Sequence, residues 1–179
     1  MVSSTRRRAL DAAVTLIGTE GIRALTHGRV DAAASLPPGS TSNHFRTRAA
    51  LVAGVIEWMA TQERDDAGPP EIHSRDDLVE ALSRMIAIQS GPLIARTRAR
   101  YALFVEADDD AIRPLREQRI GMEAWVRSIL LELGGEAAAE HTVFLMAAAD
   151  GLMFHRVTVD PDAPIGPAIA RAVDAAIGL

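Results

Sequence analysis

Apolar side chains recur every three or four positions along most of this chain, which is the spacing of amphipathic α-helices. In the segment 3–19, Leu10, Val14 and Ile17 follow this spacing, and Gly21 comes just after its end. No stretch alternates apolar and polar residues for long enough to predict a β-strand. The pattern therefore predicts an all-α protein with about nine helices.

The first third of the chain predicts three helices in close succession and a longer fourth one. Thr26 is a candidate N-cap for a helix over 26–34, and Pro37-Pro38-Gly39 prevents that helix from continuing because proline lacks a backbone donor. A third helix of barely two turns is expected over 40–45, and Thr47 can cap the fourth. Two short helices around a tight turn are typical of domains that present a short polar helix to the major groove of DNA.

Beyond residue 66 the pattern predicts five more helices separated by glycine and proline. The segment 67–70 is Ala-Gly-Pro-Pro, which is typical of a linker, and Ser74 with Asp77 forms a capping-box pattern. Gly91-Pro92 ends the helix that follows, and the next helix reaches about residue 107. The remaining helices are expected over about 114–133, 136–157 and 165–177.

Composition narrows the class of protein. Hydrophobic residues make up 48% and charged residues 24% of the 179 residues, as in an ordinary soluble protein of one or two domains. No run of 18 apolar residues is present, and the N-terminal segment is amphipathic, so neither a membrane span nor a secretory signal is expected. The chain has no cysteine, which excludes disulfides and thiolate metal sites. We therefore expect a cytoplasmic protein.

Charge is divided unevenly along the chain. Residues 1–50 hold seven Arg and three acidic residues, whereas residues 51–179 hold twelve Arg and 21 acidic residues. Contact with phosphate is thus expected in the first third. The predicted third helix is polar, and its hydroxyl and amide side chains suit phosphate oxygens and base edges. These side chains can equally just solvate an exposed short helix; they are Ser40, Thr41, Ser42, Asn43 and His44.

The register of these features resembles the tetracycline-repressor (TetR) family of transcriptional regulators. Its members look like LTxxxVAxxAGVxxGxLYxHF followed by a basic residue and a leucine, and residues 25–51 follow this pattern with a Pro-Pro-Gly-Ser-Thr turn. The resemblance covers about residues 6–60. It implies a helix-turn-helix DNA-binding domain over 1–47 and a ligand-binding and dimerisation domain over 48–179, with the fourth helix as the connection.

The resemblance also implies positions that contact DNA. In the second helix they are Thr26, His27 and Arg29, and Arg48 matches a cation that binds phosphate from the fourth helix. The recognition-helix positions are Pro38, Ser40, Ser42, Asn43 and His44. Several features depart from the pattern, among them Gly28, which replaces a longer side chain, and Ser35, which replaces the usual glycine. Phe45 is left as the aromatic residue of the recognition helix.

Two features of the remaining chain suggest a dimer and a ligand pocket. The predicted helix 136–157 is apolar nearly all round, so it is expected to pair with the last helix across a two-fold axis, although a core helix in a monomer has the same pattern. A small-molecule pocket between the middle helices needs apolar walls with a few polar groups. Its candidates are Met85, Gln89, Tyr101, Phe104, Met122, Trp125 and Phe144.

Enzymatic motifs are absent from the sequence. There is no HExxH, no glycine-rich phosphate loop and no GxSxG, and the five histidines show no helical spacing suited to a metal. These absences leave no predicted cofactor or catalytic residue. The TetR resemblance implies a homodimeric transcriptional regulator, a repressor that binds an operator and is released by a small apolar or amphipathic effector. The alternative is a helical small-molecule-binding or adaptor protein of the same fold that has weak or lost sequence-specific DNA binding.

Overall fold

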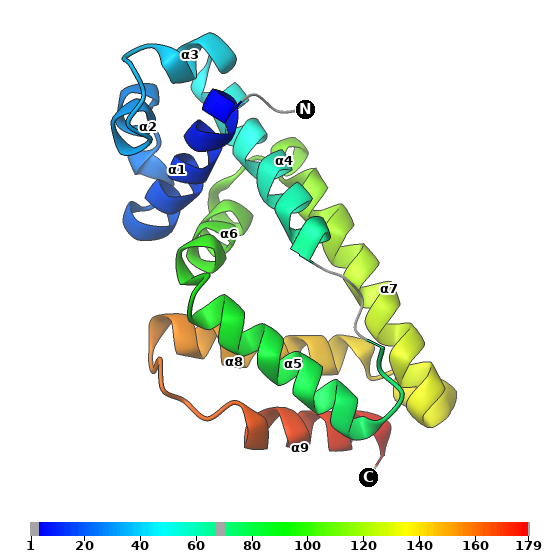
Figure 1. Cartoon of the computed structure of the whole chain (residues 1–179). Coiled ribbons are helices and arrows are strands. Elements are labelled where there is room, and N and C mark those ends of the chain that lie inside the picture. The colour runs from blue at the N-terminus through cyan, green and yellow to red at the C-terminus, as the bar shows by residue number, and fades with distance from the viewer. Residues whose placement is uncertain (1–3, 67–70, 179) are drawn as a thin grey trace. The chain divides into compact units, whose positions relative to one another are not determined.

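The computed structural model describes residues 4–66 and 71–178. These residues form nine α-helices, one short 3-10 helix and no β-strand, which confirms the predicted all-α fold (Figure 1). By their contacts they group into two compact units, 4–66 with 95–118 and 71–94 with 119–178. No helix among them combines the length and the apolar character needed to cross a membrane. The predicted linker at 67–70 lies outside the described residues.

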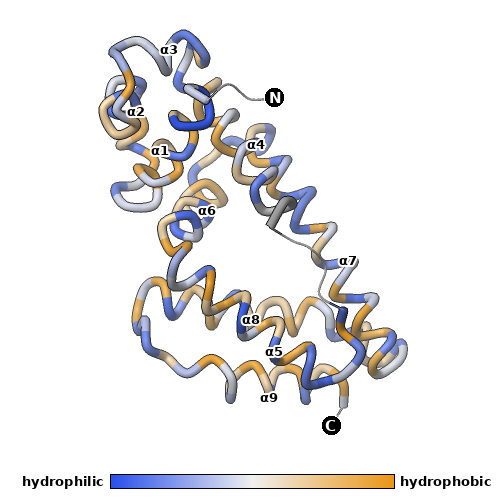
Figure 2. The backbone as a smooth tube through the Cα atoms, viewed as in Figure 1, coloured by the Kyte–Doolittle hydropathy of each residue, from blue (hydrophilic) through white to orange (hydrophobic). Residues whose placement is uncertain are grey.

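The first unit is built around a core shared by the N-terminal helices. Its elements are α1 (Ser4–Glu20), η1 (Ile22–Ala24), α2 (His27–Ala33), α3 (Ser40–His44), α4 (Arg48–Asp66), nearly all of α6 (Ile94–Glu106) and the start of α7 (Asp109–Ala139). The apolar stripe of each helix faces this core, and Figure 2 shows hydrophobic positions recurring along the helices. Its fully buried side chains include Leu10, Leu25, Leu51, Ile56 and Met59.

The second unit packs three helices on one another: α5 (Arg75–Ser90), α8 (Thr142–Thr158) and α9 (Gly166–Ile177), as Figure 1 shows. The rest of α7 contributes Leu130 to the same core. Arg75 also joins α5 to α9, because its guanidinium donates to both carboxylate oxygens of Asp174, at 2.6 and 3.0 Å. This bidentate geometry is the favourable one for an arginine–carboxylate pair.

Helix N-termini follow the sequence prediction. The hydroxyl of Thr26 accepts from the backbone of Arg29 at 3.4 Å, and the hydroxyl of Ser74 accepts from the backbone of Asp77 at 3.2 Å. Thr47 caps α4 in the same way. The structure therefore confirms these three caps. Their prediction from sequence works because a short polar side chain before a helix satisfies backbone donors that have no partner within the helix.

Two predicted boundaries along α7 are wrong. The helix begins at Asp109 rather than near Pro114, since Asp109 and Asp110 place negative charge in its first turn. It also continues beyond the predicted stop, to Ala139, across a kink at Gly135, where φ is 73°. Glycine accepts this left-handed conformation at low cost, so the chain changes direction and then resumes the helix. The predicted helix over 136–157 is therefore divided, and α8 begins at Thr142.

Candidate nucleic-acid interface

The turn between α2 and α3 is held by backbone hydrogen bonds and by an arginine from α1. The amide of Leu36 donates to the carbonyl of Asp31 at 2.8 Å, and Ser35 adopts a left-handed φ of 51°, as in a Schellman motif. The guanidinium of Arg8 donates to the carbonyls of Ala34 and Ser35, at 2.7 and 3.0 Å. Arg8 thus fixes the turn against α1.

The start of α3 rests on the buried carboxylate of Asp31. One oxygen accepts from the amide of Gly39 at 2.8 Å, and the other accepts from the amide and the hydroxyl of Thr41, at 2.8 and 2.5 Å. Burial alone would raise the pKa of Asp31, but the hydrogen bonds from Thr41 and Gly39 outweigh it and lower the pKa below its usual range. Asp31 is therefore a charged cap for the first turn of α3.

The end of α3 is held by Phe45. Its ring faces the guanidinium of Arg6, with 5.2 Å between the Cζ atom and the ring centroid. On α4 the ring lies against Gly54, where an added Cβ would come within 2.4 Å of the ring atom Cε1. The carbonyl of Phe45 accepts from Nε2 of His27 at 2.7 Å. Side chains from α1 and α2 and the close approach of α4 therefore fix this end of the helix.

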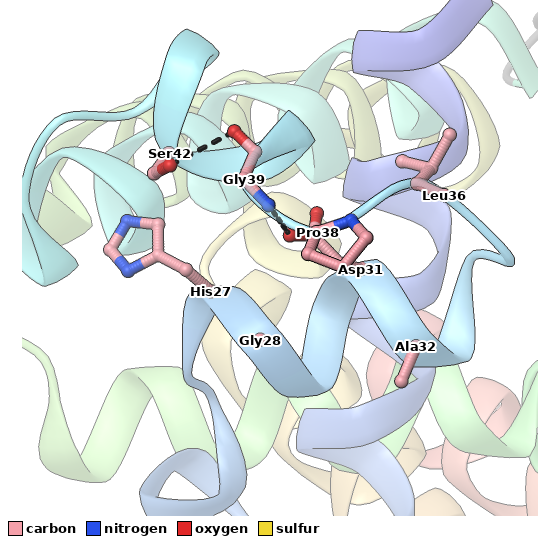
Figure 3. A pocket seen from close by; sticks show the side chains of 8 residues that line it. All are labelled: His27, Gly28, Asp31, Ala32, Leu36, Pro38, Gly39 and Ser42. Atoms are coloured by element: carbon pink, nitrogen blue, oxygen red, sulfur yellow. Dashed lines mark hydrogen bonds between the residues drawn. The ribbon is translucent and has the colours of Figure 1, made fainter.

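A hollow of about 360 Å³ opens between α2 and the start of α3 (Figure 3). Figure 3 shows His27 on α2 and Ser42 on α3 at one end of it. An added Cβ at Gly28 would meet no atom within 4 Å, so the absent side chain leaves this place open. The lining consists of His27, Gly28, Asp31, Ala32, Leu36, Pro38, Gly39 and Ser42.

The five polar residues of α3 do not share one environment. Asn43 and His44 are exposed, and Ser40 and Ser42 are partly exposed. The two serine hydroxyls already donate within the turn, to the carbonyls of Pro37 and Gly39. Thr41 has no exposed surface, so its side chain serves the contact with Asp31 and is not available to a base edge.

The other predicted DNA contacts lie around this helix with partners of their own. Arg29 is exposed and forms an ion pair with Glu20 of α1. Arg48 donates to the carbonyl of Ile22 at 2.8 Å, while Pro38 is exposed beside the hollow. The geometry thus brings the predicted residues together around α2 and α3, and it gives several of them a structural role as well.

The predicted ligand residues fall in both units. Tyr101 and Phe104 belong to the first unit. In the second unit Met85, Met122 and Trp125 pack against the core, and Gln89 is partly buried. Phe144 is 48% exposed, so it lies on the outer face of α8 and not in the core.

The outer face of α8 carries an apolar stripe, which we call the α8 stripe. It consists of Val143, Phe144, Ala147, Gly151 and Phe154, all exposed. Val143 and Phe144 are neighbours, and the later residues follow at steps of three or four along one face of the helix. The opposite face, with Leu145 and Met153 among others, is buried in the second unit. The helix is apolar all round because one face packs in the core of the second unit and the other face carries the exposed α8 stripe.

Similarity to known proteins identifies the family. The family model described as the tetracyclin repressor-like C-terminal domain matches residues 73–179, more than half of the chain. The chain belongs to the TetR family. Members of this family are DNA-binding regulators and not enzymes, so this chain is a transcriptional regulator. A comparison with curated protein sequences finds no match.

Solved structures of TetR-family proteins resemble the whole chain. A TetR-family member from Streptomyces coelicolor A3 is 25% identical with a TM-score of 0.74, over 99% of this chain and all of the other. The multidrug binding protein EbrR in complex with ethidium is 25% identical with a TM-score of 0.68, over the same shares. Its complex with proflavin is 26% identical with a TM-score of 0.61, over 97% of this chain and all of the other.

The sequence did not predict which side chains hold the turn and α3 in place. Arg8 and Asp31 were not predicted to act there, because their partners are turn and α3 residues far along the chain. The sequence does hold one signal for Asp31: it is a charged residue where the TetR pattern has alanine, directly after Val30, which is fully buried.

Proposed function

We propose that this TetR-family regulator is a repressor that contacts operator DNA through α3 and leaves it when a small molecule binds. The observation that carries the proposal is the short polar helix α3, held at its start by Asp31 and at its end by Phe45. A recognition helix needs this rigidity, since base edges are distinguished by hydrogen bonds of fixed geometry.

The proposed contacts divide by chemistry. Asn43, His44 and the hydroxyl of Ser42 are the groups for base edges, with Ser40 and Pro38 at the start of the helix. The groups for phosphate are Thr26 at the N-cap of α2, His27 and Arg29 on α2, and Arg48 on α4. The excess of arginine in residues 1–50 supports this assignment, because phosphate contacts dominate DNA affinity.

We propose further that two chains pair through α8 and α9. The α8 stripe supports this proposal, since large apolar side chains flank Ala147 and Gly151, which allow another backbone to approach. An isologous pairing of two helices from each chain makes a four-helix bundle. Such a dimer binds two half-sites about one or two helical turns apart on one face of DNA, and the site of action is the cytoplasm.

The effector is proposed to be a small apolar or amphipathic molecule. The similar protein EbrR was solved in complex with ethidium and with proflavin, and in both comparisons the similarity extends over the whole EbrR chain. In this chain Met85, Met122, Trp125 and the partly buried Gln89 offer apolar surface and a polar group in the second unit. Ligand binding would favour a conformation in which α4 no longer supports DNA binding, which is a shift between two populations.

The DNA part is tested by fluorescence anisotropy with duplexes from the region upstream of the gene and with random duplexes, at several salt concentrations. We expect preference for an upstream duplex. Arg48→Ala should weaken binding to all duplexes and flatten the salt dependence, whereas Asn43→Ala should change the preference at particular base pairs. Equal binding of all duplexes by the unaltered chain would overturn the proposal.

The effector part is tested on the protein without DNA, because planar cations bind DNA themselves. Proflavin is titrated into the protein while tryptophan fluorescence is recorded, with Trp125→Phe and Trp58→Phe as the matched pair of variants. We expect saturable binding whose fluorescence change is lost in Trp125→Phe and kept in Trp58→Phe. Loss of the change in Trp58→Phe alone would contradict a site in the second unit.

The second candidate is a ligand-binding protein of this fold without sequence-specific DNA binding. The open hollow at Gly28 favours it, as does the lack of a Phe, Tyr or Trp side chain on α3. The same anisotropy experiment separates the two functions, because this candidate shows no preference among duplexes while still binding the effector.

A further inference from the structure

Asp31 and Thr41 stand at two positions where the TetR pattern has alanine and leucine. In the structure the two positions lie against each other, since the carboxylate of Asp31 accepts from both the amide and the hydroxyl of Thr41. Asp31 is 3% exposed and Thr41 is fully buried. A buried carboxylate that is hydrogen-bonded to a threonine thus stands where the pattern has two apolar residues beneath α3.

Because Asp31 is buried, its carboxylate needs hydrogen-bond partners from the protein. A buried carboxylate is unfavourable unless its oxygens are hydrogen-bonded, and here the donors come from Gly39 and Thr41 alone. These donors belong to the first turn of α3, which has only five residues, Ser40–His44. A helix this short has little stability of its own, so its place depends on tertiary contacts.

The first turn of α3 also carries the groups proposed for base contact. Ser40 and Ser42 flank Thr41, and the hydroxyl of Ser42 donates to the carbonyl of Gly39, the other residue held by Asp31. Asn43 follows one residue later, and its backbone N–H donates to the same carbonyl of Gly39 at 3.1 Å. A shift of Gly39 and Thr41 therefore moves every one of these groups.

We propose that Asp31, together with Thr41, is the positioning residue for base recognition: its buried carboxylate sets the place and direction of the first turn of α3. This inference rests on the proposed function, because it needs α3 to contact bases. Asp31 acts through α3 and does not touch DNA. The DNA-binding preference, rather than the general affinity for DNA, is therefore the property that depends on it.

The test compares variants on two duplexes: one enriched by the unaltered chain from a random library, and one with the same bases scrambled. Asp31→Asn keeps the shape of the side chain but turns an amide donor toward the donors of α3. Thr41→Val keeps the volume and removes one hydrogen bond. Ile112→Val is the control, because it removes a methylene from a fully buried side chain of the same core on another helix, α7.

We expect Asp31→Asn to reduce the ratio of affinities for the two duplexes at least tenfold, with binding to the scrambled duplex unchanged within twofold. Thr41→Val should reduce the ratio about three- to tenfold, and Ile112→Val should leave it unchanged. Asp31→Ala combined with Thr41→Leu restores the residue pair of the TetR pattern, and we expect it to recover most of the ratio that Asp31→Ala alone loses.

The outcomes separate the two proposals. An unaltered chain that enriches no duplex overturns the proposed function and this inference with it. A chain that does enrich one, while Thr41→Val and Asp31→Asn keep the ratio within twofold, overturns this inference alone. An equal loss in Ile112→Val assigns the effect to general stability and also overturns it. If Asp31→Asn does not fold, Thr41→Val and the double variant decide, and a double variant without recovery counts against the inference.

Discussion

Single residues around α2 and α3 serve both the fold and the proposed contact with DNA. Arg29 is the clearest case, because the cation proposed for a phosphate is paired with Glu20 in the free protein. Ser35 is another: it occupies a left-handed position where glycine is favoured, and two hydrogen bonds from Arg8 to this turn compensate. At such positions one substitution separates the structural role from the functional one.

Ser35→Gly should stabilise the protein by about 1 kcal/mol, since glycine accepts a left-handed φ without the steric cost that a Cβ brings. The free energy of unfolding in urea measures this. Ala33→Gly is the control, because Ala33 is the last residue of α2 and has no left-handed φ, so glycine there costs up to about 1 kcal/mol. A loss of stability in both variants would show that the turn does not require a left-handed residue.

Glu20→Gln should raise DNA affinity about two- to fivefold at low salt, because Arg29 no longer has a carboxylate that competes with phosphate. The slope of log affinity against log salt should steepen by about one unit. Anisotropy over a salt series measures both. Glu117→Gln removes a similar exposed partner, that of Arg113, and should change neither quantity. An unchanged slope in Glu20→Gln would mean that Arg29 does not contact phosphate.

At the scale of elements, the sequence predicts helices better than the contacts between them. The helices follow from apolar spacing and from caps such as Thr26 and Ser74, which are local signals. The contacts that position α3 are not local. Asp31 is hydrogen-bonded to Thr41, ten residues later, and the ring of Phe45 packs against Gly54 on the next helix. The kink at Gly135 was missed for a similar reason, because a glycine pair predicts a stop and does not tell whether the helix resumes.

Gly54→Ala should weaken DNA binding and destabilise the protein by about 1–3 kcal/mol, because its Cβ would overlap the buried ring of Phe45. Thermal unfolding and anisotropy measure the two effects. Gly121→Ala is the control, since a Cβ there meets no atom within 4 Å and favours the helix α7. Full DNA affinity in Gly54→Ala would show that the packing of Phe45 against Gly54 does not determine the position of α3.

In the whole molecule, the proposed DNA-binding surface belongs to the first unit and the proposed pairing surface belongs to the second. The α8 stripe exposes Phe144 and Phe154, at 48% and 52%, on a helix whose other face is already buried. Exposed apolar patches of this kind mark interaction sites in soluble proteins. Apolar spacing alone predicted the apolar helix, but it could not tell the core face from the outer one.

Phe154→Glu should convert the proposed dimer to a monomer, because two charges would face each other across the proposed two-fold axis. Light scattering at micromolar concentration should give twice the 19.2 kDa chain mass for the unaltered protein and a single chain mass for the variant. Ile88→Glu alters a side chain with 42% exposure on α5 and should leave the dimer intact. A dimer that survives Phe154→Glu would place the pairing surface elsewhere.

Enrichment from a random duplex library shows whether α3 of the proposed dimer recognises particular base pairs. The library is bound to the full chain at moderate salt, recovered and sequenced over several rounds. We predict enrichment of a two-fold symmetric sequence with half-sites about one or two helical turns apart, whose preferred bases change in Asn43→Ala. Recovered duplexes with no shared sequence beyond that of the starting library would contradict such recognition.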